Sequence, residues 1–96
     1  MSNRITDKML ERRIAELNQL TGQAPAPYHK NADGTMRANI GTYYLDQAYG
    51  GVNLAQMVTD GGGITCPLGI GTRPKRELYG QLEAMLTGIK LAKGAA

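Results

Sequence analysis

Residues 5–20 read ITDKMLERRIAELNQL, and their apolar side chains recur every three or four positions. This spacing places the apolar residues on one face of an α-helix. Thr6 is a favoured N-cap, and Asp7 puts a negative charge in the first turn, where the helix dipole favours it. Gly22 is suited to end the helix. We therefore expect a helix over residues 5–20 with one apolar face that needs a partner.

A second apolar stripe lies near the other end of the chain and predicts another helix. Thr72 or Arg73 would cap it, and Pro74 fits its first turn. Gly88 is expected to begin its end, and residues 1–4 and 91–96 are expected to fray. This second stripe consists of Leu78, Leu82, Met85, Leu86 and Ile89. With one apolar stripe each, the two helices would pack on each other or across a dimer interface.

The glycine-rich middle of the chain carries signals for short strands. Asp33-Gly34 is a turn signal that predicts antiparallel strands on either side of it. Pro67 would place the last strand at a sheet edge. The expected strands cover residues 27–30, 35–40, 40–45 and 64–68.

Residues 52–59 fit a short helix of about two turns, ended by the glycine run 61–63. The sequence therefore predicts an α+β fold, in which two terminal amphipathic helices surround a Gly-rich middle with short antiparallel strands and one short helix.

Length and composition predict one domain over residues 1–96. The chain has 13 Gly, five Tyr and no Phe or Trp, which limits the core that one copy can build. We therefore expect a homo-oligomer. The start lacks the apolar segment of a signal peptide, and no apolar run approaches the roughly 20 residues of a membrane span. We expect a cytoplasmic protein that does not bind membranes.

Most catalytic arrangements lack their residues here. Ser2 is the only serine, which argues against a serine triad, and His29 is the only histidine. Cys66 and His29 would form a nucleophile–base pair only if the fold brings them together. No spacing of His, Cys, Asp or Glu resembles a metal site. We expect no enzyme, no cofactor and no metal.

Residues 68–76, LGIGTRPKR, are the most suggestive stretch for binding. Pro74 stands where a dinucleotide-binding loop needs its third glycine, which excludes that motif. A glycine-bearing loop still enters a helix start, where free N–H groups and the dipole favour an anion. The phosphate-binding candidates are Gly69, Gly71, Thr72, Arg73, Lys75 and Arg76, and the alternative is a solvated basic surface.

Aromatic and amide side chains supply the remaining candidates for a nucleotide site. Tyr43, Tyr44 and Tyr49 would stack on a base, or belong to the core and edges of a Phe-free domain. Asn39 and Asn53 would read base or ribose edges.

Three segments together resemble a family of small proteins encoded by tailed bacteriophages. These segments are the start ITDKMLERRIAELNQLTG, the stretch NIGTYYLDQAYGGVNLAQM with its AYGG, and TRPKRELYGQLEAMLTGI after the GGG run. The resemblance covers most of the chain. It implies a phage origin and expression in the host bacterial cytoplasm, and it transfers no site residue.

Phage accessory proteins often act by binding, which suggests three hypotheses. The first is an anti-defence sponge that sequesters a phosphate-containing nucleotide signal. The second is a protein–protein inhibitor of a host factor, for which the amphipathic helices would offer a face. The third is nucleic-acid binding, which a net charge of only +3 does not favour.

Overall fold

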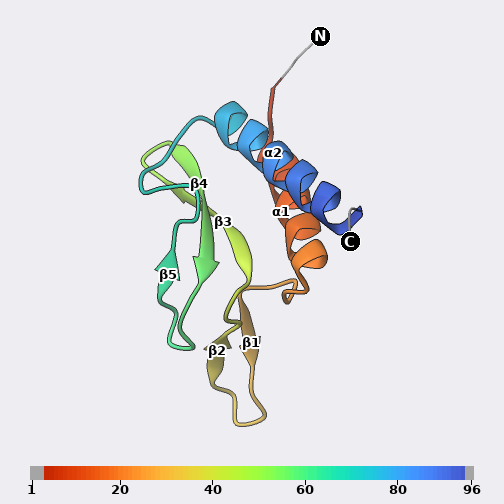
Figure 1. The fold of residues 1–96 in the computed structure, drawn as a ribbon. Coiled ribbons are helices and arrows are strands. Elements are labelled where there is room, and N and C mark those ends of the chain that lie inside the picture. Colours follow the sequence, from red (N-terminus) through yellow and green to blue (C-terminus); the bar gives the residue numbers. More distant parts are fainter. Residues whose placement is uncertain (1–3, 95–96) are drawn as a thin grey trace.

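The computed structural model describes residues 4–94, so the expected fraying of residues 1–3 and 95–96 lies outside the described chain. The α+β architecture is confirmed: two terminal helices enclose two small antiparallel sheets (Figure 1). The elements are α1 (Asp7–Thr21), β1 (Tyr28–Lys30), β2 (Met36–Ala38), β3 (Tyr43–Ala48), β4 (Gly51–Met57), β5 (Ile64–Thr65) and α2 (Lys75–Gly94).

The predicted ends of α1 are confirmed. The Thr6 side chain accepts a hydrogen bond from the Met9 N–H at 3.2 Å, as an N-cap does. Gly22 adopts the left-handed conformation at φ 73° and ends the helix. Local chemistry therefore sets both ends of α1.

The two helices run side by side in the same direction and cover one face of the three-stranded sheet (Figure 1). The apolar faces of the two helices pack against each other and against the side chains of β4 that point toward the helices. The polar faces of the helices are left toward solvent. The buried core consists of Leu10, Ile14, Leu17, Val52, Leu54, Leu78, Leu82 and Leu86.

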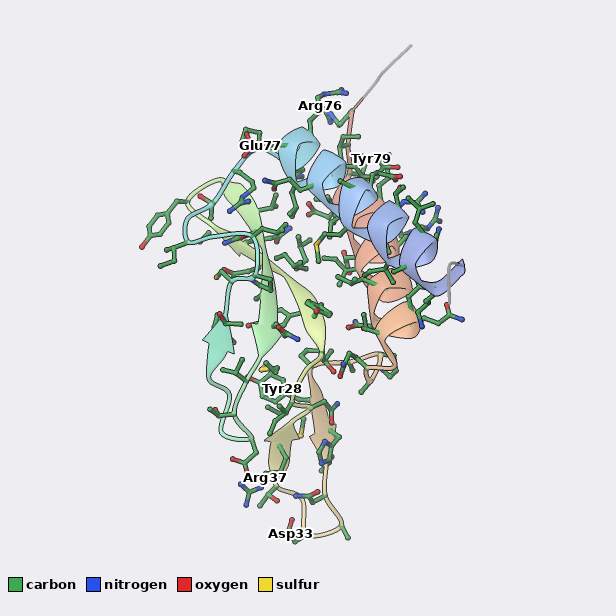
Figure 2. The ribbon with its side chains drawn as sticks, in the orientation of Figure 1. Tyr28, Asp33, Arg37, Arg76, Glu77 and Tyr79 are labelled. Atoms are coloured by element: carbon green, nitrogen blue, oxygen red, sulfur yellow. The ribbon has the colours of Figure 1, made fainter. Side chains whose placement is uncertain are left out.

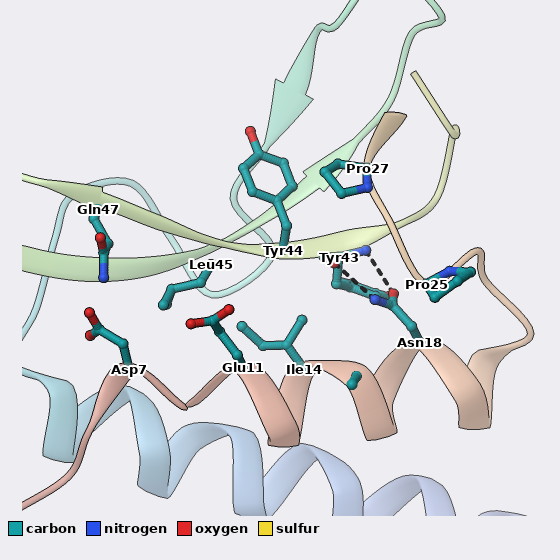
Figure 3. Close-up of a pocket in the computed structure, with 11 residues that line it drawn as sticks. Asp7, Glu11, Ile14, Asn18, Pro25, Pro27, Tyr43, Tyr44, Leu45 and Gln47 are labelled. Atoms are coloured by element: carbon teal, nitrogen blue, oxygen red, sulfur yellow. Dashed lines mark hydrogen bonds between the residues drawn. The ribbon is translucent and has the colours of Figure 1, made fainter. Parts of the chain in front are cut away.

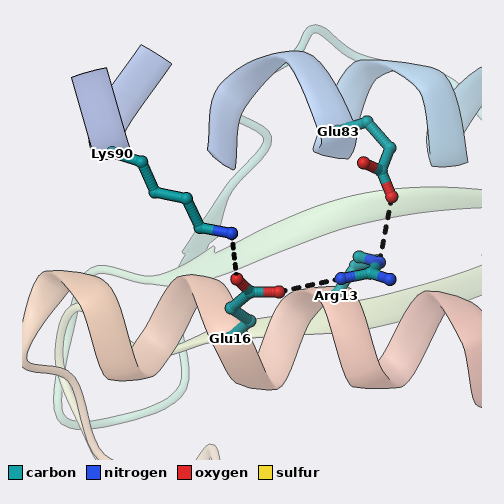
Figure 4. Close-up of polar contacts among 4 residues, drawn as sticks. All are labelled: Arg13, Glu16, Glu83 and Lys90. Carbon is teal, nitrogen blue, oxygen red and sulfur yellow. Dashed lines mark hydrogen bonds and ion pairs between the residues drawn. The ribbon is translucent and has the colours of Figure 1, made fainter. Parts of the chain in front are cut away.

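Ion pairs join the exposed flank of this helix pair. Arg13 pairs with Glu16 at 2.9 Å and with Glu83 at 3.0 Å, and Lys90 reaches Glu16 from α2 (Figure 4). Hydrogen bonding from Lys90, supported by Arg13, lowers the pKa of Glu16 below its ordinary value of 4.5. The pairs connect successive turns of both helices outside the leucine core.

The predicted short helix over residues 52–59 is wrong, because residues 51–57 form the central strand β4. Tyr49 and Gly50 have φ of 52° and 75° and make the two-residue turn that joins β3 to β4. Such a turn fixes an antiparallel register, in which Leu45 lies opposite Leu54. The helices bury one face of β4, and the loop after β5 lies against the other face. Because both faces are covered, the sequence of β4 does not alternate between polar and apolar residues, and its apolar residues also fit the spacing of a helix.

The other strands lie near their predicted places. β1 and β2 flank the Asp33-Gly34 turn as expected, and their hairpin projects from the body with Asp33 at its tip (Figure 2). β3 begins later than predicted and continues to Ala48. β5 is an edge strand, as predicted, but it stops at Thr65.

The predicted end of α2 at Gly88 is also wrong, because the helix continues to Gly94 and includes residues 91–94. A glycine inside a helix costs only about 1 kcal/mol relative to alanine, which is too little to stop a helix that packs through Leu82 and Leu86. Within residues 4–94, neither helix is long and apolar enough to cross a membrane.

The depressed pKa of Glu16 predicts an acid-sensitive stability. Its ion pairs stabilise the fold fully above the unfolded pKa and are lost as the pH falls through the lower folded pKa. We expect the free energy of unfolding to fall less for Glu16→Gln than for the wild type between about pH 6 and about pH 3. Urea unfolding at several pH values measures this difference.

Glu11→Gln is the matched control, since Glu11 lies on the same helix and makes no ion pair within residues 4–94. Identical pH profiles for Glu16→Gln and the wild type would contradict the assigned role.

Candidate functional site

The loop between β5 and α2 is fastened to the sheet at two points. Arg73 and Val52 exchange two backbone hydrogen bonds of 2.9 Å, so the returning chain pairs with β4. The Asn53 side chain, on the sheet face turned away from the helices, donates to the Gly69 carbonyl at 3.0 Å. Asn53 therefore holds the loop in place.

The Arg73 guanidinium is directed into this loop. Its Nη1 donates to Gln81 Oε1 at 2.8 Å and to the Leu68 carbonyl at 3.3 Å. Its Nη2 donates to the carbonyls of Gly69 at 3.1 Å and Gly71 at 3.3 Å. Both glycines have strongly positive φ, which side chains larger than hydrogen rarely adopt. The loop therefore turns carbonyl oxygens toward the chain's own cation.

The other basic residues of the stretch lie around the start of α2. Lys75 Nζ pairs with Asp7 Oδ1 at 2.9 Å, and this contact ties the first turns of both helices together. Arg76 projects from the start of α2 at the surface (Figure 2). Thr72 is exposed beside Gly51, where an added Cβ would come within 2.8 Å of the Thr72 side chain. Phosphate binding by these residues stays a prediction, and the Nη1 and Nη2 groups of Arg73 already donate to Gln81 and to carbonyls of the loop.

Replacing Arg73 should destabilise the protein. In Arg73→Ala, the oxygens of Leu68, Gly69 and Gly71 lose their shared donor, so we expect a loss of about 1–3 kcal/mol. Urea unfolding measures this loss. Arg12→Ala, an exposed change on α1, is the control and should alter stability by less than about 0.5 kcal/mol. Equal stabilities for the two variants would contradict the role of Arg73 in holding the loop.

The three predicted base-stacking tyrosines do not lie on one face of the sheet. Tyr43 and Tyr44 are neighbours on β3 and point to opposite faces of the sheet, and Tyr43 packs against the core. Tyr49 stands fully exposed in the β3–β4 turn. Asn39 donates to the Ala26 carbonyl at 2.7 Å, and its Oδ1 contacts the His29 ring.

A groove lies between α1 and β3 on the described surface (Figure 3). One cavity of about 370 Å³ adjoins a second of about 400 Å³, and both are bordered by Asp7 and Gln47. The second cavity continues to the β3–β4 turn at Gly50. The first cavity is lined by Asp7, Glu11, Ile14, Ala15, Asn18, Pro25, Pro27, Tyr43, Tyr44, Leu45 and Gln47.

Asn18 closes one end of this groove. Its Nδ2 donates to the Tyr43 carbonyl at 2.9 Å, and its Oδ1 accepts from the Tyr43 N–H at 2.8 Å (Figure 3). Asn18 is 3% exposed, and Tyr43 is half-buried, so both bonds are partly shielded from solvent. A side-chain amide thus takes the place that a neighbouring strand would occupy beside Tyr43.

The rest of this β3 edge is open. Val52 on β4 lies opposite Gln47 on β3, and its N–H and carbonyl bond to Arg73 on the side away from β3. In an antiparallel pair both residues of such a position point their backbone groups away from each other, so the N–H and carbonyl of Gln47 point away from β4. The N–H and carbonyl of Tyr43 also point away from β4, toward Asn18. Because this orientation repeats at every second residue of a strand, the N–H and carbonyl of Leu45 point away from β4 as well. Within residues 4–94, no hydrogen bond joins these outward groups of Leu45 and Gln47 to another segment.

The first cavity is bordered by the carboxylates of Asp7 and Glu11, and the second by Asp7 and its partner Lys75. The Glu11 carboxylate points from α1 toward β3 beside Leu45 (Figure 3). Hydrogen bonding from Lys75 and then Gln47 lowers the pKa of Asp7, which stays charged near neutrality. Burial, followed by the nearby Asp46 carboxylate, raises the pKa of the Tyr44 phenol, which therefore keeps its proton.

The groove has the chemistry of a binding surface. It offers an open strand edge, apolar side chains and the two carboxylates of Asp7 and Glu11. Among residues 4–94, no group of three or more His, Cys, Asp or Glu side chains is placed to hold a metal ion. Comparisons with protein-family models, curated proteins and solved structures find no match for this chain.

Sequence reasoning missed the groove and Asn18. One signal was present: Asn18 follows Leu10, Ile14 and Leu17 on the apolar face of α1, where a buried amide requires hydrogen-bond partners. Its partner Tyr43 lies 25 residues away, so the sequence does not identify it.

Proposed function

We propose that this chain is a non-catalytic binding protein that takes up a segment of another protein in the groove between α1 and β3. The open edge of β3 is the observation that carries this proposal, because exposed strand edges are common docking sites for protein segments. The apolar stretch formed by Ile14, Ala15 and Leu45 adds contact area along that edge.

The resemblance to small tailed-bacteriophage proteins supplies the biological setting of the proposal. In that setting, the partner is a protein of the bacterial host, and the chain inhibits it by occupying one of its surfaces in the cytoplasm. The resemblance supports the origin and the compartment, and the groove supports the mode of binding. The expected homo-oligomer remains compatible with a groove on each copy.

The nucleotide-sponge hypothesis has less support. Its strongest candidate, Arg73, directs both Nη groups at protein oxygens, and Lys75 pairs with Asp7. The proposed aromatic cover is divided between the two sheet faces and the β3–β4 turn. Substitution of Arg76 at the start of α2 tests the nucleotide-sponge hypothesis, because it leaves the contacts of Arg73 with the loop before α2 in place.

Blocking the groove should abolish partner capture. Ala15 is exposed on α1 and lines the groove, so the arginine in Ala15→Arg would fill it and keep high helix propensity. We expect tagged wild-type protein to enrich one bacterial protein from a host lysate and Ala15→Arg to lose it. Quantitative mass spectrometry of the captured proteins measures the ratio.

Ala84→Arg is the matched control, since Ala84 is an exposed alanine on α2 outside the groove lining. It should capture the partner as the wild type does. Equal capture by both arginine variants would contradict the groove as the binding surface, and specific retention of a nucleotide would favour the sponge.

A further inference from the structure

We infer that the occupant of the groove is an extended, basic segment of the partner, which adds to the sheet as a strand beside β3. This inference rests on the proposed function and names the chemistry of its partner. It follows from the backbone groups that face the groove, from the side chains on both of its walls and from its charge.

The backbone of β3 defines the register of the added strand. Leu45 and Gln47 each direct one donor and one acceptor into the groove. Asn18 already fills the equivalent position at Tyr43, so the added strand would stop there and extend toward the β3–β4 turn. Residues of the occupant directly opposite Leu45 and Gln47 would exchange hydrogen bonds with them.

The side chains of an added strand would alternate between two walls. Those opposite Leu45 and Gln47 would face α1, where they meet Ile14 and the Glu11 carboxylate (Figure 3). The intervening ones would face Tyr44 on the other side of the sheet. Because the first cavity has walls on both sides of β3, it suits an extended chain better than a helix.

Charge selects a basic occupant over a second copy of this chain. The lining of the first cavity contains Asp7 and Glu11 and no Lys, Arg or His, and the one cation that lines the second cavity, Lys75, is already paired with Asp7. Asp46 on β3 adds a carboxylate next to the open positions. Pairing two copies through β3 would bring these carboxylates face to face, which is unfavourable, whereas Lys or Arg in an added strand would complement them.

A displayed library of random 12-residue peptides, selected against the full 96-residue chain, tests the inference. We expect enrichment of peptides that combine Lys or Arg with β-branched or aromatic residues. Fluorescence anisotropy then gives the affinity of the most enriched synthetic peptide for each protein variant. Failure to enrich any peptide, or enrichment of acidic ones, would overturn the inference.

Gln47→Pro and Gln47→Ala separate backbone pairing from side-chain contact. The outward Gln47 N–H serves no bond to β4, so proline there removes the docking donor and spares the β3–β4 ladder. We expect Gln47→Pro to weaken peptide binding at least about tenfold and Gln47→Ala less than about threefold. Equal affinities for Gln47→Pro and wild type would reject strand addition.

Methylation of the peptide backbone provides a test that does not depend on folding of the proline variant. N-methyl groups at alternate positions should reduce affinity in one register and be tolerated in the next, because only every second N–H faces β3. Equal effects in both registers would overturn the inference.

Two results distinguish failure of this inference from failure of the proposed function. Partner capture that is lost in Ala15→Arg but unchanged in Gln47→Pro would keep the groove as the binding site and reject the added strand. Dissociation of a wild-type dimer by Gln47→Pro, seen in analytical ultracentrifugation, would assign the edge to a second copy and overturn the basic segment.

Discussion

The pair of hydrogen bonds between the Asn18 amide and the Tyr43 backbone joins α1 to the sheet. A buried amide without partners would be unfavourable, so the two bonds set both the position of the helix and the place where β3 becomes covered. Beyond that point the outward groups of Leu45 and Gln47 border a groove. One buried side chain therefore determines where the strand edge is closed and where it is open.

A glycine-rich loop before a helix can direct either N–H groups or carbonyl oxygens at a charged group, and the loop before α2 directs carbonyl oxygens. Glycines at a helix start can turn N–H groups toward an anion. Here the positive φ of Gly69 and Gly71 accompanies carbonyls that accept from the Arg73 guanidinium. The cation at the helix start is thus matched by oxygens of the preceding loop, and this ties the loop to α2 through Gln81.

The parts of the fold that local sequence determines could be predicted. Thr6 and Gly22 set the ends of α1 through contacts within a few residues, and the leucine stripes identify both helices. The strand β4 could not be separated from a helix because its two faces are both buried. The site could not be predicted because its decisive contacts, such as Asn18 with Tyr43, join distant segments.

The proposed binding mode requires the edge of β3 to be closed at Tyr43 and open at Leu45 and Gln47. Amide hydrogen exchange followed by NMR tests it most directly, because exchange reports whether each N–H is hydrogen-bonded. Tyr44 and Asp46 face β4 and Tyr43 faces Asn18, so these amides should exchange slowly. Leu45 and Gln47 should exchange much faster in the free protein. Protection of Leu45 and Gln47 equal to that of Tyr44 would contradict the open edge and the groove built on it.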